Sequence, residues 1–417
     1  MGGEGRRSQG PPPPSVWEAA LFSTDAGAGM KILLVTNDFR PMTGGEATWY
    51  EAVCGSVPLD CIEVLAPRMR GDNDFDRRQP YQIIRRRVPT QPHPLARLAQ
   101  MALLFMHAAR HVRRDHIDAI HIGHLYLGPI GLALKYLRRI PYTLYLHGGE
   151  MAPYLKFRGV RAVVRMVVRH AQIVVFNSAY TRRHYEAMGI FHSHTEILTM
   201  TVDARRFRPG LDGSPVRASY GLNGARVILT VGRLIERKGH DTVIRALDRI
   251  RQSGGPVKYL IVGEGPDEAR LRRLARDLGC ESDVIFAGNV REEALPSFYA
   301  ACDVFVMPNR SLAGRDGVEG FGIVFLEAGA CGKPVIGGRS GGVADAVLNG
   351  VTGYLVDPLD VGEVSGTITR LLTDRAEAVR MGKQGRLRVV GLGSAWKATL
   401  ARVWEGTNGG GIVLAAK

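Results

Sequence analysis

A glycine-rich segment around residue 320 constrains this chain more strongly than any other. Residues 314–342 read GRDGVEGFGIVFLEAGACGKPVIGGRSGG, with Glu319 and Glu327 on either side of a Gly-Phe-Gly turn. The apolar run after Gly322 is typical of a buried helix, so the turn would present main-chain amides at the start of that helix. Such an end is a ready site for a phosphate group. Two carboxylates beside it would suit sugar or ribose hydroxyls, which can donate hydrogen bonds to them.

Composition limits the class of protein. The 417 residues, 45% of them hydrophobic, are enough for two globular domains, and no apolar run approaches the roughly 20 residues that span a bilayer. The net charge of +15 calls for an anionic partner, such as nucleic acid, an anionic membrane face or a phosphorylated substrate. The scattered cysteines form no metal or disulfide pattern and favour a reducing, cytoplasmic location: Cys54, Cys61, Cys280, Cys302 and Cys331.

The two ends of the chain differ from the rest. Residues 1–29 begin MGGEGRRSQGPPPPS, which is too polar and too rich in proline and glycine to fold, so we predict a disordered extension or a misassigned start. Met30 directly precedes a convincing first strand. Residues 407–417 are also predicted to be disordered.

Between these ends, short aliphatic runs alternate with helical patterns, which predicts an α/β protein with doubly wound parallel sheets. A second series of such units opens at Arg226, so we expect two domains. The strands expected in the first series are residues 30–36, 62–66, 82–86, 119–122, 142–146 and 173–176.

Polar residues and glycines follow several of these strands, at the edge where open α/β sheets bind ligands. Gly44 and Gly45 follow the first strand, His147 follows the strand ending at Leu146, and Asn177 follows the next. On its own, a glycine pair usually marks a turn and a histidine in this position is usually structural. Their shared position in successive strand–turn–helix units favours a binding edge.

A basic pair follows the first strand of the second half. Gly232 and Arg233 open the sequence GRLIERKG, in which Lys238 lies five residues after the arginine. An arginine presents a planar fork of donors and a lysine a point charge, and both suit a nucleotide diphosphate. Together they could neutralise a leaving diphosphate without a metal ion.

The Glu319 segment resembles the Glu-x7-Glu signature of the retaining glycosyltransferases of family 4, which have the GT-B fold. The neighbouring Leu326-Glu327-Ala328 and Ser340-Gly341-Gly342 fit as well, as does Gly-Arg-x4-Lys-Gly at Gly232. The resemblance covers about residues 30–400. It implies two Rossmann-like domains facing across a cleft. These are an acceptor-side domain (30–208), a donor-nucleotide domain (209–385) and a helix over 386–406 that crosses back to the first domain.

The resemblance also implies roles for individual residues. Glu319 would contact hydroxyls of the donor sugar, Glu327 would accept from the ribose, and the main chain near Val290 would lie beside the base. The expected catalytic residues are His147, Arg233, Lys238 and Glu319; the expected donor-binding residues are Gly45, Gly232, Val290, Gly320, Phe321, Gly322, Ile323 and Glu327; the expected acceptor-side residues are Gly44, Asn177, Arg161 and Arg165.

Arg161 and Arg165 belong to a basic stripe within VRAVVRMVVRH, residues 160–170. Their spacing of four places them on one face of a helix otherwise built of valines. A charge run is usually a solvated helix face. The alternative is attachment to an anionic membrane surface, such as the inner face of the plasma membrane, where each basic residue contributes on the order of 1 kcal/mol.

The family implies front-face displacement, in which a donor phosphate oxygen takes the acceptor proton and no cofactor or metal is needed. Asp72, Asp74 and Asp76 have Asp-x-Asp spacing, but we expect them in a polar loop of the first domain. Residues 316–327 most resemble bacterial mannosyltransferases that build phosphatidylinositol mannosides. This favours GDP-mannose as donor and a lipid-linked, polyprenyl-linked or otherwise phosphorylated acceptor.

Other functions stay open at this point. A family 4 transferase that uses UDP-glucose or UDP-N-acetylglucosamine would share every residue named. A catalytically inactive module that binds a nucleotide sugar is harder to exclude, although five intact residues argue against it: Glu319, Glu327, Arg233, Lys238 and His147. A nucleic-acid-binding protein is disfavoured because aromatic residues make up only 7% of the chain and no recognition module is evident. A phosphorylase-like enzyme is disfavoured because no lysine-bearing pyridoxal segment is evident.

Overall fold

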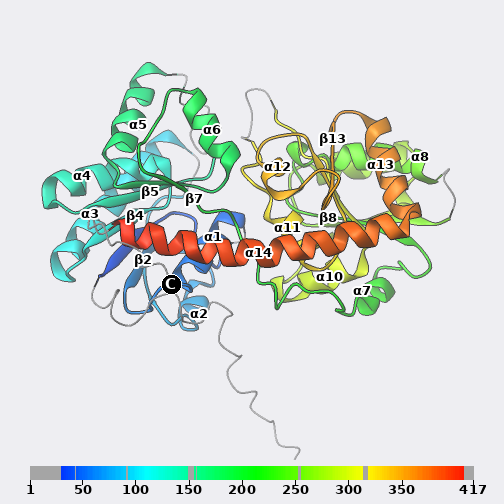
Figure 1. Ribbon diagram of the computed structural model, residues 1–417, viewed down its shortest axis with the longest axis horizontal. Coiled ribbons are helices and arrows are strands. Elements are labelled where there is room, and N and C mark those ends of the chain that lie inside the picture. Colours follow the sequence, from blue (N-terminus) through cyan, green and yellow to red (C-terminus); the bar gives the residue numbers. More distant parts are fainter. Residues whose placement is uncertain are drawn as a thin grey trace, which may run out of the picture.

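A computed structural model describes residues 30–42, 44–90, 93–148, 155, 157–251, 255–312 and 318–407. These residues form two α/β lobes that lie side by side, with one long helix running along both (Figure 1). Each lobe contains one sheet, and every strand pairing in both sheets is parallel. The predicted α/β class with two doubly wound domains is confirmed. The disorder predicted for 1–29 and 408–417 concerns residues outside the described part.

The amino-terminal lobe is built on a seven-stranded sheet of order β3-β2-β1-β4-β5-β6-β7. The order reverses between β1 and β4, which is where open α/β sheets form a ligand crevice. Its elements are β1 (Ile32–Val35), α1 (Gly45–Cys54), β2 (Ile62–Pro67), α2 (Asp72–Asp76), β3 (Gln82–Arg86), α3 (Pro94–Arg114), β4 (Ala119–Ile122), a 3₁₀ turn (Leu125–Leu127), α4 (Gly128–Arg138), β5 (Tyr142–Leu146), α5 (Arg158–His170), β6 (Ile173–Phe176), α6 (Ala179–Ala187) and β7 (Thr195–Ile197).

The carboxyl-terminal lobe is built on a six-stranded sheet of order β10-β9-β8-β11-β12-β13, and its switch point lies between β8 and β11. Its elements are α7 (Ser214–Ser219), β8 (Arg226–Val231), a 3₁₀ turn (Glu236–Lys238), α8 (His240–Arg251), β9 (Val257–Val262), α9 (Glu268–Asp277), a 3₁₀ turn (Glu281–Asp283), β10 (Val284–Gly288), a 3₁₀ turn (Glu292–Ala294), α10 (Leu295–Ala301), β11 (Val304–Met307), α11 (Ile323–Ala330), β12 (Val335–Gly338), α12 (Val343–Ala346), β13 (Gly353–Val356), α13 (Val361–Thr373) and α14 (Arg375–Thr407).

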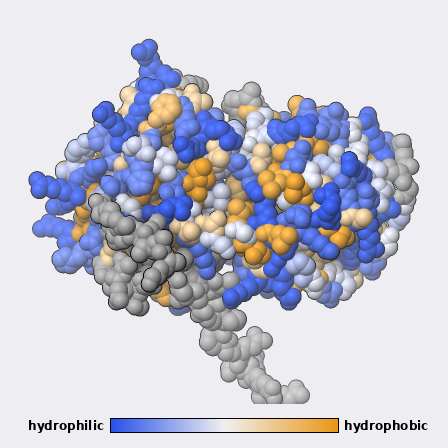
Figure 2. Space-filling model, in the orientation of Figure 1, coloured by the Kyte–Doolittle hydropathy of each residue, from blue (hydrophilic) through white to orange (hydrophobic). Residues whose placement is uncertain are grey.

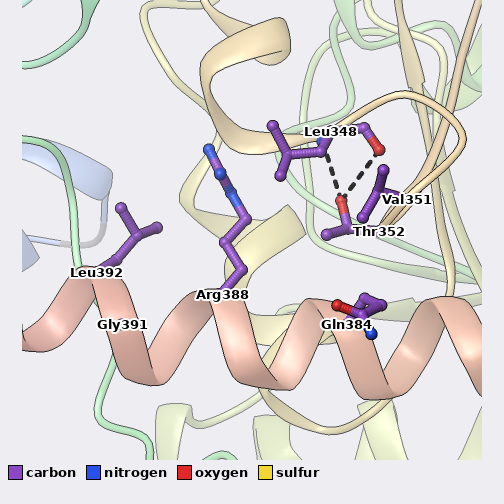
Figure 3. A pocket seen from close by; sticks show the side chains of 7 residues that line it. All are labelled: Leu348, Val351, Thr352, Gln384, Arg388, Gly391 and Leu392. Carbon is purple, nitrogen blue, oxygen red and sulfur yellow. Dashed lines mark hydrogen bonds between the residues drawn. The ribbon is translucent and has the colours of Figure 1, made fainter.

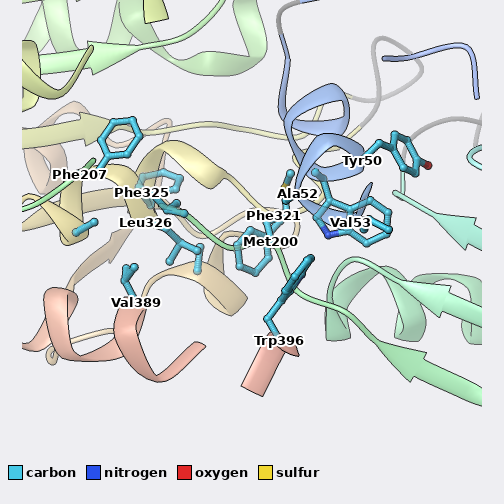
Figure 4. Close-up of a cluster of buried hydrophobic side chains, with 14 of the residues drawn as sticks. Tyr50, Ala52, Val53, Met200, Phe207, Phe321, Phe325, Leu326, Val389 and Trp396 are labelled. Carbon is cyan, nitrogen blue, oxygen red and sulfur yellow. The ribbon is translucent and has the colours of Figure 1, made fainter. Parts of the chain in front are cut away.

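The strands are short and apolar because helices cover both faces of each sheet. The four residues of β1, for example, are completely buried. One large hydrophobic cluster continues from one lobe into the other. Figure 4 shows Val53 of α1 and Met200 near Phe321 of the Gly-Phe-Gly turn, with Trp396 of α14 beside them. The two lobes therefore share a core.

Helix α14 extends further than the sequence indicated. The predicted crossing helix covers 386–406, whereas the structure has one continuous helix from Arg375 to Thr407. Gly382 allows its first half to approach the carboxyl-terminal lobe, because a Cβ there would lie 1.9 Å from the carbonyl oxygen of Gly332. The prediction that disorder begins at residue 407 is wrong, since Thr407 is fully buried and its hydroxyl lies 3.0 Å from that of Thr143.

One further prediction needs correction. Asp72, Asp74 and Asp76 lie on α2 and not in a loop. Asp76 forms an ion pair of 2.8 Å with the buried Arg85, so this carboxylate already has a partner within the lobe. The short helix α7 follows the expected domain boundary between residues 208 and 209. Strand β7 was not predicted, nor were β12 and β13 in the second half.

Candidate active site

The Gly-Phe-Gly turn lies against the loop that follows β5 in the other lobe. A Cβ on Gly320 would lie 2.3 Å from the carbonyl oxygen of His147 and 3.0 Å from Nδ2 of Asn177. Asn177 Nδ2 in turn donates to that carbonyl at 3.1 Å, and both side chains are buried. Only glycine permits this approach. The structure thus brings the predicted donor-side turn together with two predicted residues of the first domain.

Glu319 is held by two cations. Its Oε2 lies 2.5 Å from Nζ of Lys238 and 3.1 Å from a guanidinium nitrogen of Arg237. Burial opposes a charge on Glu319, but Lys238 and Arg237 lower the pKa of its carboxyl below the ordinary value. The carboxylate is therefore ionised at neutral pH and oriented by two donors from the loop after β8.

Arg237 was not predicted as a site residue, and the expected contact of Arg233 with a donor diphosphate stays a prediction. Arg233 is exposed, while Arg237 occupies the 3₁₀ turn beside Lys238. The sequence RLIERKG holds three cations, and only the backbone decides which faces Glu319. The run of two adjacent basic residues at 237 and 238 was the available signal. Gly232 lies close by, since a Cβ on it would be 3.8 Å from Cε of Lys238.

Glu327 lies on α11, about one helical turn after Ile323, the first residue of that helix. Phe321 and Gly322 directly precede the helix. Its Oε2 accepts a hydrogen bond of 2.6 Å from the hydroxyl of Tyr299. Burial raises the pKa of Glu327, although the Tyr299 hydrogen bond acts in the opposite direction. Helix α11 begins directly after Gly322, which has a φ of 94°. This left-handed residue turns the chain sharply between the two glutamates.

The loop that carries Gly44 and Gly45 reaches the same region. Helix α1 begins at Gly45, after Gly44 with a φ of 152°. A Cβ on Gly45 would lie 3.3 Å from Cε of Met200 and 3.8 Å from Cγ2 of Ile323, the first residue of α11. The starts of α1 and α11 are thus neighbours across the two lobes. Val290 follows β10 and packs, partly buried, against the shared core.

His147 is surrounded by side chains that the sequence did not single out. The hydroxyl of Tyr50 lies 2.6 Å from its Nε2, and the ring of His124 lies 5.9 Å away. His124 Nε2 contacts Asp38 at 2.5 Å and Glu46 at 3.0 Å. Burial opposes a charge on His124, but Glu46 and Asp38 raise the pKa of this imidazole well above its ordinary value.

Asp38, Glu46 and His124 are also the one group in the described ranges whose side chains could hold a metal ion. Burial would raise the pKa of Glu46, but His147 and His124 lower it to about 2. His124 Nε2 lies within ion-pairing distance of both carboxylates, so a protonated imidazole already brings a positive charge to this cluster. We expect no metal there, and the prediction that the enzyme uses none has still to be tested.

Two of the predicted acceptor-side residues lie away from the turn around Gly320. Arg161 and Arg165 are on α5, which covers the amino-terminal sheet. Arg165 donates from Nε to the carbonyl of Gly189 at 3.0 Å, after the end of α6. A separate hollow of about 380 Å³ lies between α14 and the loop at 348–352, where Arg388 and Leu348 face each other (Figure 3). Its lining includes none of the predicted site residues.

Known proteins match both halves of the chain. A family model described as Glycosyltransferase Family 4 matches residues 62–206, and one described as Glycosyl transferases group 1 matches residues 215–388. The chain is 35% identical over 366 residues to a GDP-mannose-dependent alpha-(1-6)-phosphatidylinositol monomannoside mannosyltransferase of Mycolicibacterium smegmatis, covering 85% of this chain and 92% of the relative. A monoacylated-acceptor counterpart from Corynebacterium glutamicum is 32% identical over 376 residues, 87% of this chain and 94% of the relative.

Solved structures agree on the fold. The crystal structure of Anabaena HepE in complex with UDP and glucose has a TM-score of 0.75 at 22% identity and covers 90% of this chain and 99% of its own. Sucrose-phosphate synthase from Thermosynechococcus elongatus has a TM-score of 0.73 at 22% identity, over 90% and 98% of the two chains. Two doubly wound domains with these structural neighbours define the GT-B fold. The chain belongs to glycosyltransferase family 4, and it is a hexosyltransferase.

Proposed function

We propose that this enzyme transfers mannose from GDP-mannose to a phosphatidylinositol-based glycolipid, with retention of the anomeric configuration. The observation that carries the transfer chemistry is the cluster of Lys238 and Arg237 on Glu319. The donor and the acceptor are proposed because relatives that match over most of their length carry those names.

The residues divide the work by charge. Lys238 and the neighbouring arginines would stabilise the diphosphate as negative charge develops on it, which is the main task when a nucleotide leaves. Glu319 would accept hydrogen bonds from sugar hydroxyls once its cations turn to the phosphates. Glu327 would accept from the ribose, and His147 would border the transferred sugar.

We further propose that the reaction is a front-face displacement that uses no metal. The acceptor oxygen forms a bond to the anomeric carbon as the bond to the diphosphate oxygen breaks, and that diphosphate takes the acceptor proton. Lys238 and Arg237 would supply the positive charge for this step, and this supports a mechanism without a metal ion.

A lipid acceptor suits the outer surface of the amino-terminal lobe. Helices α3, α4 and α5 carry only basic charged residues, and Figure 2 shows strongly hydrophilic side chains at this end of the molecule. Large apolar side chains are exposed among them: Leu95, Leu98, Tyr136, Leu137, Phe157, Val163 and Met166. We propose that this surface, the α3–α5 face, rests on an anionic membrane. No helix in the described ranges is long and apolar enough to cross a bilayer.

A thermal-shift screen tests the donor. Purified protein is heated with GDP, GDP-mannose, UDP, UDP-glucose and UDP-N-acetylglucosamine, each with and without EDTA. We expect GDP and GDP-mannose to raise the unfolding midpoint, equally with EDTA. A shift with uridine nucleotides alone would replace the donor but keep the enzyme class, and loss of the shift in EDTA would refute the metal-free mechanism. Transfer of labelled mannose to phosphatidylinositol mannosides in vesicles then tests the acceptor, and an inactive binding module would bind GDP-mannose without transfer.

A further inference from the structure

The hydroxyl of Tyr50 contacts two groups, and together they determine which of them receives its proton in a hydrogen bond. Its hydroxyl oxygen lies 2.6 Å from Nε2 of His147 and also donates a hydrogen bond to the carbonyl oxygen of Gly123. Gly123 follows β4, and a Cβ on it would lie 3.1 Å from Cζ of Tyr50. The glycine therefore allows the phenol to reach the main chain at this position.

The donor and acceptor count assigns the proton on His147. A carbonyl oxygen can only accept, so the one proton of the Tyr50 hydroxyl is directed to Gly123. The phenol oxygen then presents a lone pair to Nε2, and this nitrogen must donate. In the neutral imidazole that tautomer makes Nδ1 the acceptor atom of the ring.

Packing also fixes the plane of the His147 ring. The rings of Trp49 and Tyr50 meet it edge to face, with centroids 5.0 and 5.4 Å away. Its main-chain carbonyl is held by Asn177 and lies against Gly320. Trp49 and Tyr50 thus fix the ring, Tyr50 also fixes its tautomer, and Asn177 and Gly320 fix its loop.

We propose that Tyr50 is a positioning residue that holds His147 with its proton on Nε2, so that Nδ1 can accept a hydrogen bond from a hydroxyl of the reacting sugars. The effect on catalysis rests on the function proposed above, because it requires His147 to border the transferred sugar. The tautomer itself does not depend on that function.

Tyr145 offers a matched control. It is fully buried like Tyr50, its ring lies 6.1 Å from that of Tyr50, and it packs against the same tryptophan. Its hydroxyl, however, pairs with Nδ1 of His121 at 2.8 Å. Tyr50→Phe and Tyr145→Phe each remove one buried hydroxyl from the same aromatic cluster, and only the first removes the partner of His147.

The experiment combines kinetics with nitrogen-15 spectroscopy of labelled histidines, with His147→Gln to assign the signals. We expect Tyr50→Phe to lower kcat by about tenfold to a hundredfold at nearly unchanged KM for GDP-mannose, as misplacement of a reacting group does. We expect Tyr145→Phe to keep kcat within about twofold of the wild type. Its loss of thermal stability should be similar to that of Tyr50→Phe. In the wild type, His147 should show a protonated Nε2 and a lone pair on Nδ1, and Tyr50→Phe should introduce the other tautomer.

Two results would overturn the proposal. One is a wild-type spectrum with the lone pair on Nε2. The other is an equal effect of the two phenylalanine variants on kcat, which would mean that any buried hydroxyl in this cluster matters equally. If the wild type transfers no sugar from any donor, the proposed function fails on its own, while the spectra still decide the tautomer.

Discussion

Arg40 and Glu292 form an ion pair of 2.7 Å that connects the two domains. Arg40 follows β1 and is almost completely buried, where it also pairs with Glu51 at 3.0 Å and donates to Thr48 at 2.8 Å. Glu292 lies two residues after Val290, in the region expected to border the base of the donor. The pair therefore couples the loop after β1 to the segment after β10, where we expect the donor base to bind.

Replacing the two partners of this pair should have unequal effects. Arg40→Met leaves Glu51 in the interface without its cation, so we expect the free energy of unfolding to fall by about 3 kcal/mol. Glu292→Gln removes a half-exposed carboxylate and leaves the Arg40–Glu51 pair, so the loss should stay below about 1 kcal/mol. Urea unfolding followed by tryptophan fluorescence measures both. Equal losses would show that Arg40 stabilises the protein mainly through Glu292 and not through Glu51.

Glu319 should make stability depend on pH. Its pKa is lowered in the folded protein, so the unfolded chain binds the proton more tightly and the ion pair stabilises the fold above the ordinary glutamate pKa, about 4.3. This contribution is lost as the pH falls through that value toward the lower folded pKa. Thermal midpoints of the wild type and Glu319→Gln, measured from about pH 7 to about pH 3, should show the wild type losing more stability. A difference that grows in favour of the wild type at low pH would contradict the lowered pKa.

The contact from Arg237 to Glu319 predicts that Arg237 takes part in donor binding. We expect Lys238→Met to lower kcat/KM by about a hundredfold and Arg237→Gln by about tenfold, because each removes positive charge from the diphosphate side. Arg245→Gln, on the exposed face of α8, is the control and should have little effect. If Arg233→Gln abolishes activity while Arg237→Gln behaves like the control, the diphosphate is bound by Arg233 and Lys238, as the family resemblance implies, and not by Arg237.

The α3–α5 face should determine binding to anionic vesicles. Replacing Arg158, Arg161 and Arg169 by glutamine should weaken cosedimentation with phosphatidylserine vesicles by about a hundredfold at low salt, at roughly 1 kcal/mol for each charge. Replacing Arg245, Arg249 and Arg273 in the other lobe changes the net charge equally and should have little effect. Equal weakening by the two triple variants would mean that net charge, and not this face, attracts the membrane.

The sequence allowed much of the fold and part of the site to be predicted, for identifiable reasons. Strands such as β4 and β5 were predicted with their observed bounds because fully buried parallel strands are short aliphatic runs between polar turns. Gly320 was found because its backbone lies too close to that of His147 for any side chain, and Gly45 because it follows a strand at the expected binding edge. Their roles in donor binding, like those of Glu319 and Glu327, remain predictions.

The residues that were missed depend on contacts between distant segments. Tyr50 lies on the buried side of α1 and reads as an ordinary aromatic core residue until the fold brings His147 to it. Arg237 lies on the 3₁₀ turn that brings it to Glu319, whereas Arg233 precedes this turn. The full length of α14 was missed because its first half packs through glycines, which interrupt the hydrophobic pattern of a helix.

Helix α14 also sets an order of events during biosynthesis. Its last turns bury Trp396, Leu400, Val403 and Trp404, and it packs on β6 and β7 of the first lobe. A ribosome makes those strands roughly 200 residues before that helix, about 10–40 s earlier at usual elongation rates. The nascent first lobe must wait through this interval with an apolar strip uncovered. Chaperone protection of that strip would therefore matter most while the second lobe is being translated.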